Sequence, residues 1–61
     1  MKRRDLIRRL ERAGCIMIRE GARHTVYLNP ATRKTSTVPR HIEVKERLAL
    51  KILDDLGIDQ P

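Results

Sequence analysis

Aromatic side chains are almost absent from this chain of 61 residues, which has no Phe, no Trp and a single Tyr, Tyr27. Sheet proteins of the RRM and OB-fold classes bind single-stranded nucleic acid by stacking bases on exposed aromatic rings. The composition therefore argues against those classes. A lone ring can either stack on a ligand or pack in the core, and both interpretations of Tyr27 are kept open at this point.

Cysteine and long apolar runs are equally scarce. Cys15 is the only cysteine, so no disulfide forms within the chain and no cysteine-based metal site can be built. Its apolar surroundings indicate a small buried hydrophobe. The longest apolar run, 15–18, is far too short to span a membrane, and the apolar pair at 6–7 is followed at once by two arginines, unlike a signal peptide. We therefore expect a cytoplasmic protein with no membrane partner.

Metal ligands are also few. The chain has two histidines, and its carboxylates gather towards the C-terminal end without the spacing of a metal site. We expect no metal and no cofactor.

Positive charge, by contrast, is abundant. Lys and Arg number 14 against 8 Asp and Glu, a net charge of +6, and the isoelectric point is about 10.5. Eleven of the basic residues but only three of the acidic ones lie in 1–41, and arginines outnumber lysines by ten to four. Guanidinium groups match phosphate oxygens in geometry, so this surface favours a polyanionic partner. The length indicates a single domain, 1–61, with a thin core.

Two segments have the apolar spacing of amphipathic helices. Over 3–13, apolar residues at positions 6, 7, 10 and 13 form one stripe, and Gly14 is placed to end the helix. Over 43–56, apolar residues recur every four positions from 44 onwards, and Gly57 closes the helix.

Three short strands are predicted between these helices, over 15–20, 23–29 and 33–38, because β-branched residues are enriched there. Asn29 and Pro30 begin a turn between the second and third strands, and Pro39 stops the sheet. The order α-β-β-β-α predicts an α+β fold, a two-layer sandwich with both helices on one face of the sheet, as in a double-stranded-RNA-binding domain.

His24 begins the second of these strands, where alternation puts it on the face of Val26 and Leu28 and opposite Thr25 and Tyr27. If Val26 and Leu28 point at the helices, His24 points there too, unless it lies at the rim or a bulge shifts it. The sequence leaves these possibilities open.

The order and spacing of several short motifs over residues 2–58 resemble the HicA family of toxins, also called YcfA-like proteins. These motifs are Gly14-Cys15, Gly21-x-x-His24, Tyr27-x-Asn29-Pro30, Thr37-Val38-Pro39-Arg40-His41 and Lys51-Ile52-Leu53-x-x-Leu56-Gly57-Ile58.

The resemblance implies a fold similar to a double-stranded-RNA-binding domain and the role of toxin in a type II toxin–antitoxin system. It further implies ribosome-independent endoribonuclease cleavage of mRNA, one essential histidine on the second strand, and neutralisation by a HicB antitoxin. His24 corresponds to that histidine. Many members place it two residues after a glycine, whereas here it comes three residues after Gly21, with Arg23 between.

Cleavage of RNA can proceed without metal, because the 2′-hydroxyl is the nucleophile and the enzyme need only move protons and stabilise charge. His24 is a candidate general base or acid. His41, ahead of the second helix, is either a second proton carrier, a phosphate contact or a residue that caps the helix. The candidate RNA or phosphate contacts are Arg23, Arg40, His41, Lys45, Arg8, Arg9, Arg12 and Tyr27.

Other interpretations remain open for the same residues. The arginines of the first helix form an RNA track, a surface for an acidic antitoxin, or simply a solvated face. A non-catalytic RNA-binding module of the same fold would use His24 as a mere contact. A DNA-binding or protein-interaction module is a third class, although about thirty residues of strand between the helices argue against a helix-turn-helix.

Overall fold

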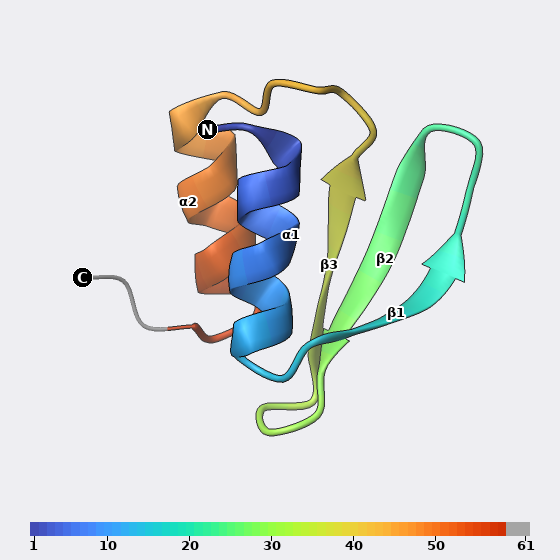
Figure 1. The fold of residues 1–61 in the computed structure, drawn as a ribbon. Coiled ribbons are helices and arrows are strands. Elements are labelled where there is room, and N and C mark those ends of the chain that lie inside the picture. Colours follow the sequence, from blue (N-terminus) through green and yellow to red (C-terminus); the bar gives the residue numbers. More distant parts are fainter. Residues whose placement is uncertain (59–61) are drawn as a thin grey trace.

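The computed structural model describes residues 1–58, and its elements follow in the predicted order. Both helices lie on one side of a three-stranded sheet (Figure 1), which confirms the predicted two-layer α+β sandwich. The elements are α1 (Arg3–Arg12), β1 (Ile16–Glu20), β2 (His24–Asn29), β3 (Lys34–Pro39) and α2 (Glu46–Asp55).

Both helices end at the predicted glycines. At Gly14 the backbone φ is 88°, the Cys15 N–H donates to the Leu10 carbonyl at 2.9 Å, and the Gly14 N–H donates to the Glu11 carbonyl at 3.0 Å. This Schellman arrangement satisfies carbonyls that a helix end leaves open, and it needs the left-handed backbone that glycine adopts without strain. Gly57, with a φ of 71°, ends α2 in the same way.

The second helix begins three residues later than predicted, at Glu46 instead of residue 43. The segment 42–44 is extended and lies along the N-terminus, where the Val44 N–H donates to the Met1 carbonyl at 2.8 Å. Glu43 forms a β-bridge with Lys2, and Lys45 has a ψ of 141°, which is far from a helical value, so the helix cannot begin before Glu46. Val44 is only 2% exposed. It is buried as part of an extended segment, and its position four residues before Leu48 matched the helical spacing by coincidence.

The sheet is an antiparallel meander in the order β1-β2-β3. β2 and β3 pair along their whole length, from His24 opposite Pro39 to Asn29 opposite Lys34. Pro39 is therefore the last residue of the sheet and not the first residue after it. Its position at an edge strand is one where a missing N–H does not interrupt the ladder.

Burial along β2 shows which face meets the helices. Thr25, Tyr27 and Asn29 are at most 7% exposed and point into the core, whereas the apolar residues between them are half-buried on the other face. His24 shares that second face, because side chains two residues apart point the same way along a strand. The alternatives left open for His24 are thereby resolved: it lies on the open face of the sheet, and it is exposed.

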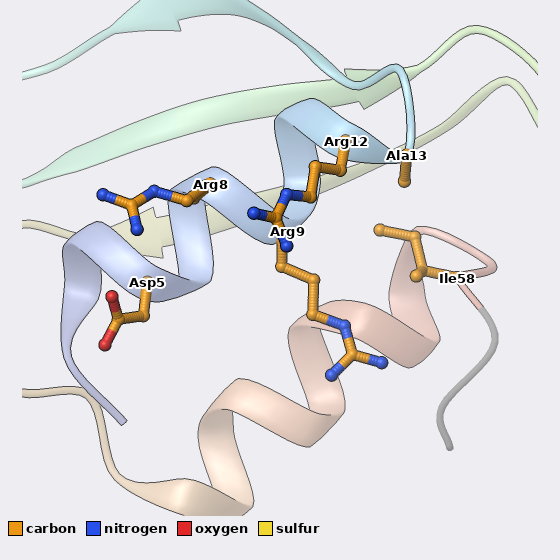
Figure 2. Close-up of a pocket in the computed structure, with 6 residues that line it drawn as sticks. All are labelled: Asp5, Arg8, Arg9, Arg12, Ala13 and Ile58. Atoms are coloured by element: carbon orange, nitrogen blue, oxygen red, sulfur yellow. The ribbon is translucent and has the colours of Figure 1, made fainter.

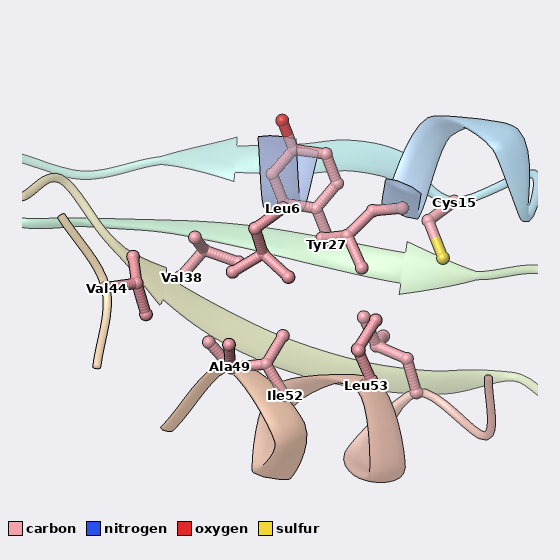
Figure 3. Close-up of a cluster of buried hydrophobic side chains, with 10 residues drawn as sticks. Leu6, Cys15, Tyr27, Val38, Val44, Ala49, Ile52 and Leu53 are labelled. Carbon is pink, nitrogen blue, oxygen red and sulfur yellow. The ribbon is translucent and has the colours of Figure 1, made fainter. Parts of the chain in front are cut away.

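The core lies between the helices and the inward face of β2 and β3 (Figure 3). Cys15 is part of it, as predicted, and burial raises the pKa of its thiol, which disfavours the reactive thiolate. Apolar side chains that are at most 7% exposed make up this core: Leu6, Leu10, Cys15, Tyr27, Val38, Val44, Ala49, Ile52, Leu53 and Leu56.

A buried asparagine links the β2–β3 turn to the end of α2. The Asn29 amide donates to the Leu56 carbonyl at 2.8 Å, and its side-chain oxygen accepts from the Ala31 N–H at 3.1 Å. Thr32 donates its hydroxyl to the same Leu56 carbonyl at 3.0 Å. The turn thus satisfies a helix-terminal carbonyl, and one residue stabilises both the hairpin and the contact between the layers.

We predict that Asn29→Ala lowers the free energy of unfolding by about 1–3 kcal/mol, because both hydrogen bonds of a buried amide are lost. Urea unfolding followed by circular dichroism measures the change. Lys34→Gln, at the exposed position that pairs with Asn29, is the matched control and should shift stability by less than about 0.5 kcal/mol. Equal midpoints for the two variants would contradict the structural role of Asn29.

Candidate functional site

His24 lies at the first position of β2, and its backbone is held from both sides. Its carbonyl accepts the Gly21 N–H at 2.8 Å, and the preceding Arg23 carbonyl accepts the Arg40 N–H at 3.2 Å. A Cβ at Gly21 would lie 3.1 Å from the His24 carbonyl oxygen, so the tight turn before β2 favours glycine. The imidazole therefore projects from a well-defined backbone at the end of the sheet.

An open depression of about 550 Å³ brings together four of the predicted site residues. Two lie at the N-terminal end of β2, one just before the strand and one as its first residue. The other two lie in the segment that follows β3, just beyond the pair of His24 and Pro39. All four are exposed. The depression is lined by Arg23, His24, Arg40 and His41, together with Ala22.

Glu20, at the end of β1, was not predicted as part of the site. Its carboxylate forms an ion pair with the guanidinium of Arg40, so it holds one wall of the depression. Both side chains are substantially exposed, and an exposed pair of this kind adds little to stability. The ion pair instead positions Arg40, because it links the end of β1 to the segment after β3, beside His24. In the sequence, the one feature that could have indicated this role is that Glu20 comes directly before the tight turn that leads to His24.

Arg19 is a second residue that the sequence analysis missed. A β-bulge between Met17 and Arg19 shifts the register of β1, so that Arg19 pairs with Val26. A directly paired residue shares the face of its partner, and one extra residue in a strand exchanges the faces of all that follow it. Arg19 and His24 line a smaller depression of about 260 Å³ beside the first.

His41 lies in the segment between β3 and α2, and its side chain does not cap α2. The residue that caps α2 is Lys45, and that cap has no side-chain hydrogen bond, so the interpretation of His41 as a helix cap is wrong. Among residues 1–58, neither the His24 nor the His41 imidazole forms a hydrogen bond or ion pair with another residue. Lys45 is exposed and lines a neighbouring depression that it shares with His41, not the one that holds His24.

The arginines of α1 form a separate cationic surface on the helix layer. Arg8, Arg9 and Arg12 line a depression of about 530 Å³ that also includes Asp5 and Ile58 (Figure 2). Neither of the two depressions beside His24 includes any of these residues. The structure thus divides the predicted contacts between the open face of the sheet and the helices.

Two residues with a predicted ligand-binding interpretation are structural instead. Tyr27 is 7% exposed and packs in the core, and burial raises the pKa of its hydroxyl. Its ring has no free face for a base, so Tyr27 is withdrawn from the RNA contacts. Arg3 belongs to the basic run of α1, yet its guanidinium donates to the Pro39 carbonyl at 2.9 Å and to the buried Thr25 hydroxyl at 3.1 Å.

Within residues 1–58, no three side chains of His, Cys, Asp or Glu converge in the way that a metal ion would require. No helix in this part of the chain has the length and apolarity needed to cross a membrane.

The fold and the site together define a class: small basic α+β proteins that expose a histidine and several arginines on the open face of a three-stranded meander. A family model for the HicA toxin of bacterial toxin–antitoxin systems matches residues 3–58. The chain belongs to the HicA toxin family, which confirms the resemblance found in the motifs, and its role is that of a toxin in a toxin–antitoxin pair. No curated protein and no solved structure matches the chain.

Proposed function

We propose that this toxin is an endoribonuclease that cleaves mRNA without a metal or other cofactor, with His24 as general acid or base. The observation that supports this most directly is the exposed imidazole of His24 in a depression that it shares with Arg23 and Arg40. A substrate of this kind would place the protein in the cytoplasm.

The chemistry needs few groups because RNA supplies its own nucleophile. The 2′-oxygen attacks the adjacent phosphorus, a base removes its proton, and an acid protonates the departing 5′-oxygen. His24 is suited to either proton transfer, since imidazole exchanges protons near neutral pH. Arg23, Arg40 and Arg19 are positioned around it to stabilise the charge that develops on the phosphate oxygens.

We predict that His24→Ala lowers the rate of RNA cleavage by about two to four orders of magnitude, the usual contribution of a general acid or base. The products of the wild-type protein should carry 2′,3′-cyclic phosphate and 5′-hydroxyl ends, and EDTA should not slow their formation. Gel analysis of end-labelled RNA, with enzymatic identification of the termini, measures both.

Thr35→Ala is the matched control, because Thr35 is exposed at the far end of the β2–β3 ladder from His24. It should cleave like the wild type. An active His24→Ala variant would exclude the proposal, and so would 5′-phosphate ends or a requirement for Mg²⁺. Circular dichroism must show that His24→Ala is folded, as expected for an exposed side chain.

A second candidate function is a non-catalytic RNA-binding module, favoured by the cationic depression on α1 that lies apart from His24. In such a module the α1 arginines would hold the phosphate backbone and His24 would be one contact among several. Cleavage by the purified protein distinguishes this function from the first. The contribution of α1 to binding is a separate question that both functions share.

We predict that replacing Arg8, Arg9 and Arg12 together with Gln flattens the salt dependence of RNA binding. Each phosphate contact on a single strand contributes a slope of about −0.7 in log K against log salt concentration, so up to three contacts are lost. Fluorescence anisotropy with the His24→Ala protein measures binding without cleavage. Gln at Arg33, Lys34 and Arg47 removes the same charge elsewhere and should alter the slope less. Equal slopes for the two triple variants would mean that α1 does not track RNA.

The partner that we propose is a HicB-like antitoxin that covers His24 and pairs acidic side chains with Arg23, Arg40 or α1. The surface to be covered combines these cations with exposed apolar side chains of β1, among them Ile16 and Ile18, which are 52% and 50% exposed. A standard interface of about 800 Å² per partner would take about a sixth of the accessible surface of 4536 Å². Complementary charge would also speed the encounter.

We predict that His24 reacts with diethyl pyrocarbonate in the isolated toxin and is protected in the complex with its antitoxin. Peptide mass spectrometry reports modification at each histidine separately, and the unbound toxin at equal concentration is the control. An inhibited complex in which His24 still reacts at the unbound rate would show that the antitoxin acts by a route other than occlusion.

A further inference from the structure

The depression beside His24 contains a second imidazole, that of His41. The two histidines come from different segments, since His24 begins β2 and His41 follows β3. They line the same depression because His24 pairs with Pro39, and because the Arg40 N–H donates to the Arg23 carbonyl beyond the end of the ladder. The β2–β3 register thus determines their proximity.

Both imidazoles are available for chemistry. Each is exposed, and among residues 1–58 neither has a hydrogen-bond or ion-pair partner. Two arginines, Arg23 and Arg40, line the same depression, and Arg40 is held there by Glu20. Two proton carriers with cations in the same depression are the set of groups that transfer of a phosphodiester to a 2′-hydroxyl requires.

We propose that His24 and His41 act as a pair, one as general base and the other as general acid, in a single cleavage step; this inference rests on the proposed nuclease function. One neutral imidazole accepts the 2′-hydroxyl proton as the 2′-oxygen bonds to phosphorus. The other, as imidazolium, gives its proton to the 5′-oxygen as the bond from phosphorus to that oxygen breaks. The products are a 2′,3′-cyclic phosphate and a free 5′-hydroxyl. After the step the base is protonated and the acid is neutral.

The protonation states of the two histidines are also restored after each cleavage. Solvent exchange returns the two imidazoles to their starting states, and hydrolysis of the cyclic phosphate would use the same two groups with their roles reversed. The arginines hold the phosphate between them throughout, because guanidinium groups stay charged at all relevant pH values.

The test compares two substrates that differ in the leaving group. One is a dinucleotide with an ordinary 5′-alkoxide leaving group, and the other is a uridine 3′-phosphodiester of p-nitrophenol, whose phenolate leaves without being protonated. His24→Ala, His41→Ala and His41→Gln are measured on both with the full chain. Ile42→Ala is the matched control, since Ile42 follows His41 and its side chain is 84% exposed.

We expect both His41 variants to lose about two to four orders of magnitude on the dinucleotide, while Ile42→Ala stays near the wild-type rate. On the p-nitrophenyl ester, the variant that lacks the acid should recover most of the lost rate relative to wild type, and the variant that lacks the base should not. Recovery by either the His24 or the His41 variants, but not by both, identifies which imidazole is the acid.

A His41 variant that cleaves the dinucleotide at nearly the wild-type rate would overturn the pairing. So would equal losses on both substrates for all three variants, or recovery by all of them. If only the His41 variants are active, the nuclease proposal with His24 stands and the pair alone is wrong. If His24→Ala is also fully active, the proposed function itself is wrong.

Discussion

The guanidinium of Arg3 connects the two layers of this protein at the point where the candidate site begins. It donates to the Pro39 carbonyl, on the residue paired with His24, and to the buried hydroxyl of Thr25, the residue after His24. Charged hydrogen bonds to such groups each contribute about 1.5–3 kcal/mol. The first turn of α1 is therefore tied to the strand ends that carry the histidine, and the helix layer is coupled to the geometry of the open face.

A sheet covered on one face only suits so short a chain. Two helices of ten residues suffice to cover the inward residues of β2 and β3, and a domain of this size buries only about 60% of its unfolded surface. The remaining face stays in solvent and is free to carry charge. Side chains on it are positioned by backbone pairing, because strand register determines which face each of them occupies.

The sequence predicted the helices, their terminal glycines and the order of the strands, because these depend on local spacing and backbone conformation. It did not predict the start of α2, where Val44 matched a helical stripe while its backbone paired with Met1. Nor did it determine the face of His24. That face depends on whether the neighbouring Thr25 points into the core, and the buried Thr25 hydroxyl accepts a hydrogen bond from Arg3 that no local sequence pattern predicts. The bulge that brings Arg19 to the face of Val26 is likewise a property of strand pairing and not of β1 alone.

The charges near His24 are arranged differently from those of α1. This difference affects how each of the two surfaces would bind an acidic partner. Arg40 is already paired with Glu20, so an acidic partner must compete with an internal carboxylate there. The α1 arginines lie on the helix layer, around a depression to which Asp5 contributes an acidic side chain. Steering of any polyanion acts at long range on the net charge of +6, whereas retention depends on contacts at short range. If the proposed nuclease function holds, RNA held only at α1 is bound without being cleaved, and cleavage requires phosphate to reach the depression on the sheet.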